Sequence, residues 1–94
     1  MIYQPGLSTV REIVNRASDA TQFGPRDITG PSRTKALCHI RYAVMLAARR
    51  KGLSLPEIGA SLNRDHTTVM DGIRRAYELK NDPDFARLLE RIDA

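Results

Sequence analysis

One segment in the second half of the chain carries side chains that can contact a nucleic acid. Residues 63–75 read NRDHTTVMDGIRR, with Asp65, His66, Thr67 and Thr68 at the expected start of a helix. A threonine hydroxyl can reach a phosphate or a base, and its methyl group can touch the methyl group of thymine. The histidine can donate or accept a hydrogen bond, and the aspartate can cap the helix or accept from a cytosine amine. This set of side chains suits the reading of base edges in a DNA groove.

Two arginines follow about two turns later on the same expected helix. Arg74 and Arg75 would lie near the sugar-phosphate backbone, where basic side chains supply affinity while base contacts supply the choice of sequence. Two plainer interpretations stay open on these residues alone. The polar first turn can be only a helix cap, and the arginine pair can be an ordinary solvated face.

The flanking residues predict that this segment is the second half of a helix-turn-helix. Ser54 and Glu57 have the spacing of a capping box, which predicts a short helix over residues 54–62. Asn63 tolerates a left-handed backbone and would form the turn before a helix over residues 65–79. In such a unit the second helix lies in the major groove, and its first residues meet base edges.

Three small or apolar residues would set the packing of this unit. Gly59 would let two helices cross closely, and Val69 would lock the second helix onto the first. Gly72 inside a helix costs about 1 kcal/mol relative to alanine. We therefore expect a close helix contact or a bend at that glycine.

The rest of the chain has apolar residues at helical spacing and no strand pattern. Thr9 and Glu12 have the spacing of a second capping box, and Gly52 is a natural stop after a long helix. We expect further helices over residues 9–20, 34–51 and 83–92, with a short helical turn over residues 26–29. The expected buried stripes are Val10, Ile13, Val14 and Ala17; Leu37, Ile40, Val44 and Ala47; Val69, Ile73 and Ala76; and Phe85, Leu88, Leu89 and Ile92. The prediction is an all-α, compact helical bundle that forms a single domain over residues 1–94.

The charge distribution favours an anionic partner. The chain has 94 residues and a formal net charge of +4. The segment from Arg26 to Lys80 holds 11 basic and 5 acidic residues, whereas the two ends together hold 4 basic and 6 acidic residues. Positive charge is therefore concentrated around the helix-turn-helix.

Several classes of protein are disfavoured by the composition. Cys38 is the only cysteine, so no internal disulfide can form, as is typical of intracellular proteins. Two histidines and one cysteine cannot assemble a structural zinc site, and no glycine-rich phosphate loop is present. No apolar run approaches the roughly 18 residues that span a bilayer, and no signal peptide is recognisable. We expect a cytoplasmic, nucleoid-associated binding protein that is not an enzyme and uses no metal or cofactor.

The segment SLPEIGASLNRDHTTVMDGIRRA, residues 54–76, resembles the signature of the C-terminal DNA-binding domain of the bacterial replication initiator DnaA. That family's pattern has S-L-P-x-I-G, then R-D-H-T-T-V, then paired basic residues. The R-D-H-T-T-V block is long and distinctive. The order of the expected helices over most of the chain also follows the family.

The resemblance implies a set of DNA contacts. The family's basic loop, whose arginine enters the minor groove, corresponds here to Arg33 and Lys35. The segment HIRYAVML resembles an arginine-bearing helix of the family, so Arg41 would contact a phosphate. The start of the helix at Ser54 would offer backbone N–H groups to phosphate. The implied major-groove readers are Arg64, Asp65, His66, Thr67 and Thr68, and Arg74 and Arg75 match the basic pair on the phosphates.

The chain departs from the family pattern in three ways. Asn63 stands alone where the family has Gly-Gly, so the turn is one residue shorter, and Asp71-Gly72 replaces His-Ala. An aspartate would repel a nearby phosphate, so we expect DNA binding with a different preferred sequence. The chain also has no Walker motif and no room for the family's ATPase module. With Met1 at its start, it is expected to be a stand-alone domain that resembles phage-derived regulators or the DNA-binding part of gene-transfer-agent activators.

These observations lead to one main hypothesis and two alternatives. The main hypothesis is sequence-specific binding of double-stranded DNA by a transcriptional regulator, an activator of phage-like or gene-transfer-agent genes. Because one helix-turn-helix reads only a few base pairs, a DNA-bending protein, a partner activator or RNA polymerase would add to its specificity. The alternatives are a replication regulator that occupies origin-type sites without an ATPase, and a helical protein-interaction module. The oligomeric state stays open, since no zipper or dimer face is recognisable.

Overall fold

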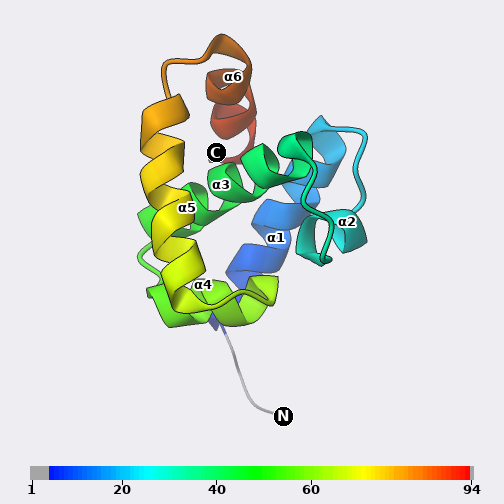
Figure 1. Ribbon diagram of the computed structural model, residues 1–94. Coiled ribbons are helices and arrows are strands. Elements are labelled where there is room, and N and C mark those ends of the chain that lie inside the picture. The colour runs from blue at the N-terminus through cyan, green and yellow to red at the C-terminus, as the bar shows by residue number, and fades with distance from the viewer. Residues whose placement is uncertain (1–4, 94) are drawn as a thin grey trace.

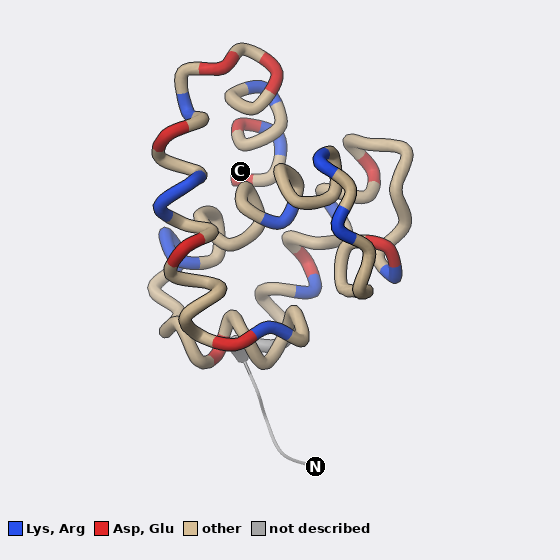
Figure 2. Tube along the Cα trace, in the orientation of Figure 1, with Lys and Arg blue, Asp and Glu red and all other residues tan. Residues whose placement is uncertain are grey.

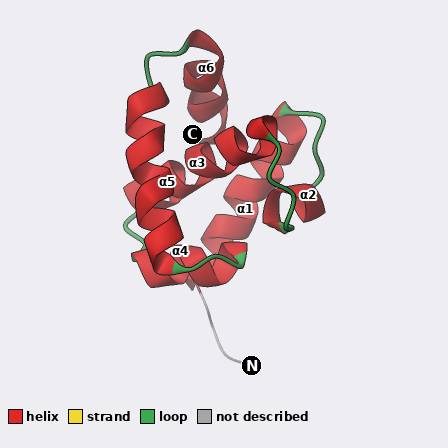
Figure 3. Ribbon diagram, in the orientation of Figure 1, coloured by secondary structure: helices red, strands yellow, loops and turns green. Residues whose placement is uncertain are grey.

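A computed structural model describes residues 5–93 of the chain, and within that range it contains helices and no strand (Figures 1 and 3). The helices are α1 (Pro5–Ala20), α2 (Pro25–Thr29), α3 (Lys35–Arg50), α4 (Leu55–Leu62), α5 (His66–Leu79) and α6 (Pro83–Ile92). The Cα radius of gyration is 12.0 Å, close to the value of about 12 Å expected for a compact chain of this length. The prediction of an all-α helical bundle is confirmed.

Local signals in the sequence place most of the helix ends. The hydroxyl of Thr34 accepts from the N–H of Leu37 at the start of α3. Ser54 and Glu57 form the predicted capping box at the start of α4, each side chain accepting from the other residue's N–H. After α3 the chain turns at Gly52, where φ is +91°, a value that glycine adopts without steric cost.

The start of α1 differs from the prediction. The helix begins at Pro5, so Thr9 lies inside it and cannot be its N-cap. Proline suits the first turn because its missing N–H has no partner there in any helix. The spacing of Thr9 and Glu12 therefore imitates a capping box in this chain, and Glu12 instead pairs with Arg16 at 2.8 Å.

Helix α3 forms the centre of the bundle and contacts every other helix of the described chain (Figure 1). Because α3 has neighbouring helices on several sides, its side chains from Ala43 to Ala48 are all buried. The predicted buried stripes are confirmed except at two positions. Ile73 and Leu88 are only partly buried at the edge of the core. The core thus holds α5 against α3 and leaves the opposite side of α5 to solvent.

Candidate nucleic-acid interface

Helices α4 and α5 form a helix-turn-helix with a tight turn. Asn63 ends α4 in a left-handed conformation with φ of 58°, and the N–H of Arg64 donates to the carbonyl of Gly59 at 2.8 Å. A Cβ on Gly59 would lie 2.4 Å from the carbonyl oxygen of Arg64. The close approach that Gly59 allows is therefore between α4 and the turn, while Val69, fully buried, anchors α5.

Gly72 lets α5 pack closely against α3. A Cβ at this position would lie 2.3 Å from the Sδ of Met45 and 3.2 Å from the Cδ1 of Tyr42. Of the two expectations for Gly72, a close contact and a bend, this geometry bears out the close contact. The contact fixes the rotation of α5 about its axis and turns the first polar residues of the helix away from the core.

The first turn of α5 is exposed and polar. His66, Thr67 and Thr68 are all exposed, and Asp65 occupies the N-cap position without making a side-chain cap bond. The Asp65 carboxylate instead accepts from the Thr67 hydroxyl at 3.0 Å and lies 3.3 Å from the Nδ1 of His66. The interpretation of these residues as a simple cap therefore does not account for the direction of the Asp65 side chain.

Arg64 lies half-buried and joins the turn to another part of the chain. Its guanidinium donates to the carbonyls of Leu62 and Asn63 and to the carbonyl of Gly30, which directly follows α2. We expected this arginine to read the major groove. In the structure its Nη1 and Nη2 donate to backbone carbonyls. Arg64 therefore links the helix-turn-helix to the connection from α2 to α3.

Arg41 differs most from its expected role. We expected it to contact a phosphate, but its side chain is 4% exposed and its guanidinium is directed into the molecule. Its Nε donates to the carbonyl of Ile28 at 2.6 Å, and its Nη2 donates to those of Asp27 at 2.9 Å and Gly30 at 3.0 Å. Its Nη1 donates to the carbonyl of Ser32.

A physical reason for this arrangement is the end of the short helix α2. The last carbonyls of a helix have no partner within it and carry partial negative charge. Arg41 supplies donors to two of them and to two carbonyls of the following loop, so it holds residues 27–32 in place. Burial, followed by the nearby charge of Arg64, lowers the pKa of Arg41.

Two basic side chains that follow the loop held by Arg41 face solvent. Arg33 and Lys35 are both exposed, and Figure 2 shows basic residues on this connection and along α5. A hollow of about 220 Å³ between α3 and α5 is lined by Lys35, His39, Tyr42 and Arg75, among others. Lys35 and Arg75 are thus brought to the same part of the surface.

The basic pair on α5 has an acidic partner that the sequence reading did not assign. Arg74 and Arg75 are 65% and 50% exposed in their side chains, and both donate to the carboxylate of Asp71. Arg74 also lies 3.4 Å from Glu78. Hydrogen bonds from Arg74 and then Arg75 lower the pKa of Asp71. The spacings i,i+3 and i,i+4 are visible in the sequence and could have identified these pairs.

Ser54 is the N-cap of α4, as predicted. The backbone N–H groups around it are, however, not all free to bind a phosphate. Its own N–H donates to the Glu57 carboxylate, and the N–H of Glu57 donates to the serine hydroxyl. These bonds lower the pKa of Glu57. Pro56 has no N–H to offer. The capping box therefore uses two of the donors that we expected to face a phosphate.

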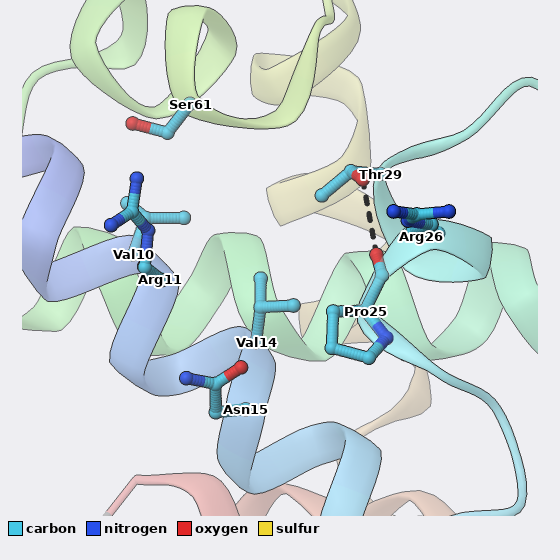
Figure 4. A pocket seen from close by; sticks show the side chains of 8 residues that line it. All are labelled: Val10, Arg11, Val14, Asn15, Pro25, Arg26, Thr29 and Ser61. Atoms are coloured by element: carbon cyan, nitrogen blue, oxygen red, sulfur yellow. Dashed lines mark hydrogen bonds between the residues drawn. The ribbon is translucent and has the colours of Figure 1, made fainter.

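A second hollow, of about 210 Å³, lies between α1, α2 and α4 (Figure 4). Its lining contains none of the predicted DNA contacts and consists of Val10, Arg11, Val14, Asn15, Pro25, Arg26, Thr29 and Ser61. Within residues 5–93 no three metal-ligating side chains gather at one place. In the same range no helix has the length and apolar character needed to cross a bilayer.

Comparison with known proteins connects this geometry to one family. A family model described as bacterial dnaA protein helix-turn-helix matches residues 10–76, from α1 into α5. The chain is 41% identical over 87 residues to the chromosomal replication initiator protein DnaA of Roseobacter denitrificans, an alignment that covers 89% of this chain and 19% of that protein. It is 43% identical over 74 residues to the DnaA of Ruegeria pomeroyi, covering 77% of this chain and 16% of that protein. The chain thus spans less than a fifth of the length of these relatives, and it belongs to the family of bacterial DnaA helix-turn-helix domains.

Proposed function

We propose that this chain binds double-stranded DNA, with the first turn of α5 in the major groove and the connection between α2 and α3 in the adjacent minor groove. The observation that carries the proposal is the exposed first turn of α5 in a helix-turn-helix of this family. His66, Thr67 and Thr68 have no packing role that would require their side chains. Their chemistry matches base edges and phosphates.

The roles of the predicted contact residues divide by exposure. Asp65, His66, Thr67 and Thr68 would read bases, while Arg33 and Lys35 would enter or flank the minor groove. Arg74 and Arg75 would lie on phosphates, and the start of α4 at Ser54 would approach the backbone. Arg41 would act from inside, since it holds the loop that presents Arg33. Arg64 would couple this loop to the turn through Nη1 and Nη2, which leaves mainly its Nε for a contact with DNA.

We further propose that the DNA contacts serve transcriptional regulation, as an activator of phage-like or gene-transfer-agent genes in the cytoplasm at the nucleoid. Residues 1–94 would act as one domain without catalytic activity. A DNA-bending protein, a partner activator or RNA polymerase would supply the specificity that a single helix-turn-helix lacks. The support is the turn at Asn63, one residue shorter than in the family's pattern, which changes how the first turn of α5 meets the bases and therefore favours sites other than those of the replication initiators.

A second candidate function is regulation of replication through origin-type sites. The observation in its favour is that the relatives are named chromosomal replication initiator proteins. Genome-wide occupancy in the native host separates the two candidates. Enrichment at promoters supports transcriptional regulation, whereas enrichment at the replication origin supports the second candidate.

DNA binding itself is tested by fluorescence anisotropy of labelled duplexes and by selection from fragmented genomic DNA. Both experiments use the whole chain at low and moderate salt, because phosphate contacts weaken as salt rises. We expect weak binding to all duplexes and enrichment of a subset of fragments. Failure to retain any duplex at either salt concentration would overturn the proposal and favour a protein-interaction module.

A further inference from the structure

The basic pair on α5 is enclosed by carboxylates of the same helix. The two carboxylate oxygens of Asp71 accept from different arginines, one from Arg74 and the other from the Nε of Arg75 at 3.0 Å. Glu78 lies on the other side of Arg74 at 3.4 Å. Residues 71–78 contain two acidic and two basic side chains, so this segment of the candidate interface has no net charge.

A carboxylate and a phosphate present the same kind of acceptor to arginine. Both offer anionic oxygens that bind the N–H groups of a guanidinium in charge-assisted hydrogen bonds. Asp71 therefore occupies donors that a DNA phosphate would need. If a phosphate takes those donors, the aspartate loses the hydrogen bonds that lower its pKa and is left as an unpaired carboxylate next to the duplex.

The surroundings of Arg75 indicate where a phosphate would lie. This arginine lines the hollow of about 220 Å³ between α3 and α5, together with Lys35 from the start of α3. In the proposed docking, the sugar-phosphate strand that separates the major from the minor groove runs between α5 and the connection from α2 to α3. Release of Arg75 from Asp71 would free this cation beside Lys35 at the hollow, whose lining also includes the carboxylate of Glu78.

We infer that Asp71 is an affinity-limiting residue, which competes with DNA phosphates for Arg74 and Arg75 and lowers the affinity for every duplex without choosing among sequences. This inference rests on the proposed DNA binding. Each arginine that moves from Asp71 to a phosphate exchanges one anion for another. The chain therefore gains less affinity and releases fewer counterions than two unpaired arginines would.

The test is Asp71→Asn in the whole chain, measured by anisotropy on a preferred duplex and on a random duplex across a range of salt concentrations. We expect both dissociation constants to fall roughly threefold to tenfold, since exposed ion pairs are individually weak. The plot of log affinity against log salt concentration should steepen by up to about one unit. The ratio of the two affinities should stay the same, because no base contact changes.

A matched control is Asp84→Asn. Asp84 pairs with Arg87 at the same i,i+3 spacing on α6, so this variant makes the same charge change outside the candidate interface. We expect its affinity to change less than about twofold, the effect of net charge alone. An equal gain in both variants would show that Asp71 acts only through net charge and would overturn the inference.

A double-mutant cycle separates competition from direct repulsion. In the Arg74→Ala/Arg75→Ala background, Asp71→Asn should lose most of its effect, because the residues for which it competes are gone. An undiminished gain in that background would overturn the inference. If Asp71→Asn changes nothing while the wild-type chain binds duplexes, the inference fails and the proposed function stands. If no variant binds any duplex, both fail.

Discussion

Arg41 gives the sharpest test of how the candidate interface is positioned. The sequence reading assigns it a phosphate contact, whereas the structure places its guanidinium among four carbonyls of residues 27–32. In Arg41→Ala the carbonyls of Ile28 and Ser32 lose their donor, those of Asp27 and Gly30 keep only the Gly30 N–H and Arg64, and the side-chain volume becomes a void. A buried acceptor left without a partner costs about 1–3 kcal/mol, and carbonyls that regain water cost less.

We expect Arg41→Ala to lower the free energy of unfolding by about 3 kcal/mol. For a domain of this size that corresponds to a fall in Tm of more than about 10 °C. Arg41→Lys should recover only part of the loss, because an ammonium cannot reach carbonyls on both sides as the planar guanidinium does. Thermal unfolding followed by circular dichroism measures both variants.

The control is Arg49→Ala on the same helix. Arg49 is exposed and donates to a single carbonyl, that of Leu53, at 2.7 Å. Its loss should cost less than about 1 kcal/mol. If Arg41→Ala unfolds at the temperature of the wild type and instead flattens the salt dependence of DNA binding by about one unit, then Arg41 is a phosphate contact and the assignment to the loop is refuted.

Three further predictions concern the exposed residues. His66→Ala should lower the discrimination between preferred and random duplexes by about 1–3 kcal/mol; equal losses on both duplexes in anisotropy titrations would contradict a base contact. Arg33→Ala should weaken binding most on duplexes with A·T-rich flanks, because narrow minor grooves attract arginine, and equal losses on G·C-rich flanks would exclude that placement. The pKa of Glu57 is lowered by its bonds with Ser54, so the stabilisation from the ionised capping box is complete at neutral pH and is lost as the pH falls below about 4. Glu57→Gln should therefore show a smaller loss of Tm between pH 6 and pH 3.5 than the wild type, and parallel losses would refute the capping-box contribution.

The helices could be predicted from the sequence because their ends depend on residues a few positions apart. The capping box of Ser54, the left-handed turn at Asn63 and the stop at Gly52 are all local. The same reasoning places α1 incorrectly, since Thr9 and Glu12 have the spacing of a cap without being one. A local pattern predicts a helix end only when no residue before it can extend the helix.

The role of Arg41 could not be predicted in this way. Its partners are backbone carbonyls 9 to 14 positions earlier in the chain, and a carbonyl has no sequence signature. Only the packing of α2 against α3 brings them together. The pairing of Asp71 with Arg74 and Arg75 was open to prediction, because i,i+3 and i,i+4 neighbours meet on any helix.

The carbonyl of Gly30 connects the two parts of the candidate interface, which are the first turn of α5 and the loop between α2 and α3. It accepts from Arg41 and from Arg64, so one atom ties α3 and the turn of the helix-turn-helix to the loop. A Cβ on Gly30 would lie 2.6 Å from the carbonyl oxygen of Arg26, so this position needs glycine. The distance from the first turn of α5 to the loop is therefore set by the protein before any DNA is bound.

Burial and pairing divide Arg33, Arg41, Arg74 and Arg75 into three groups with different consequences for DNA binding. Arg41 is inside, and the arginine pair on α5 is occupied by Asp71. Arg33, in contrast, is exposed, and within residues 5–93 its side chain forms no hydrogen bond or ion pair. An exposed cation without a partner has no ion pair to break when it meets a phosphate or a narrow groove. Under the proposed function, the loop that carries Arg33 therefore contributes a larger share of the affinity in this chain than the basic pair that follows the recognition residues.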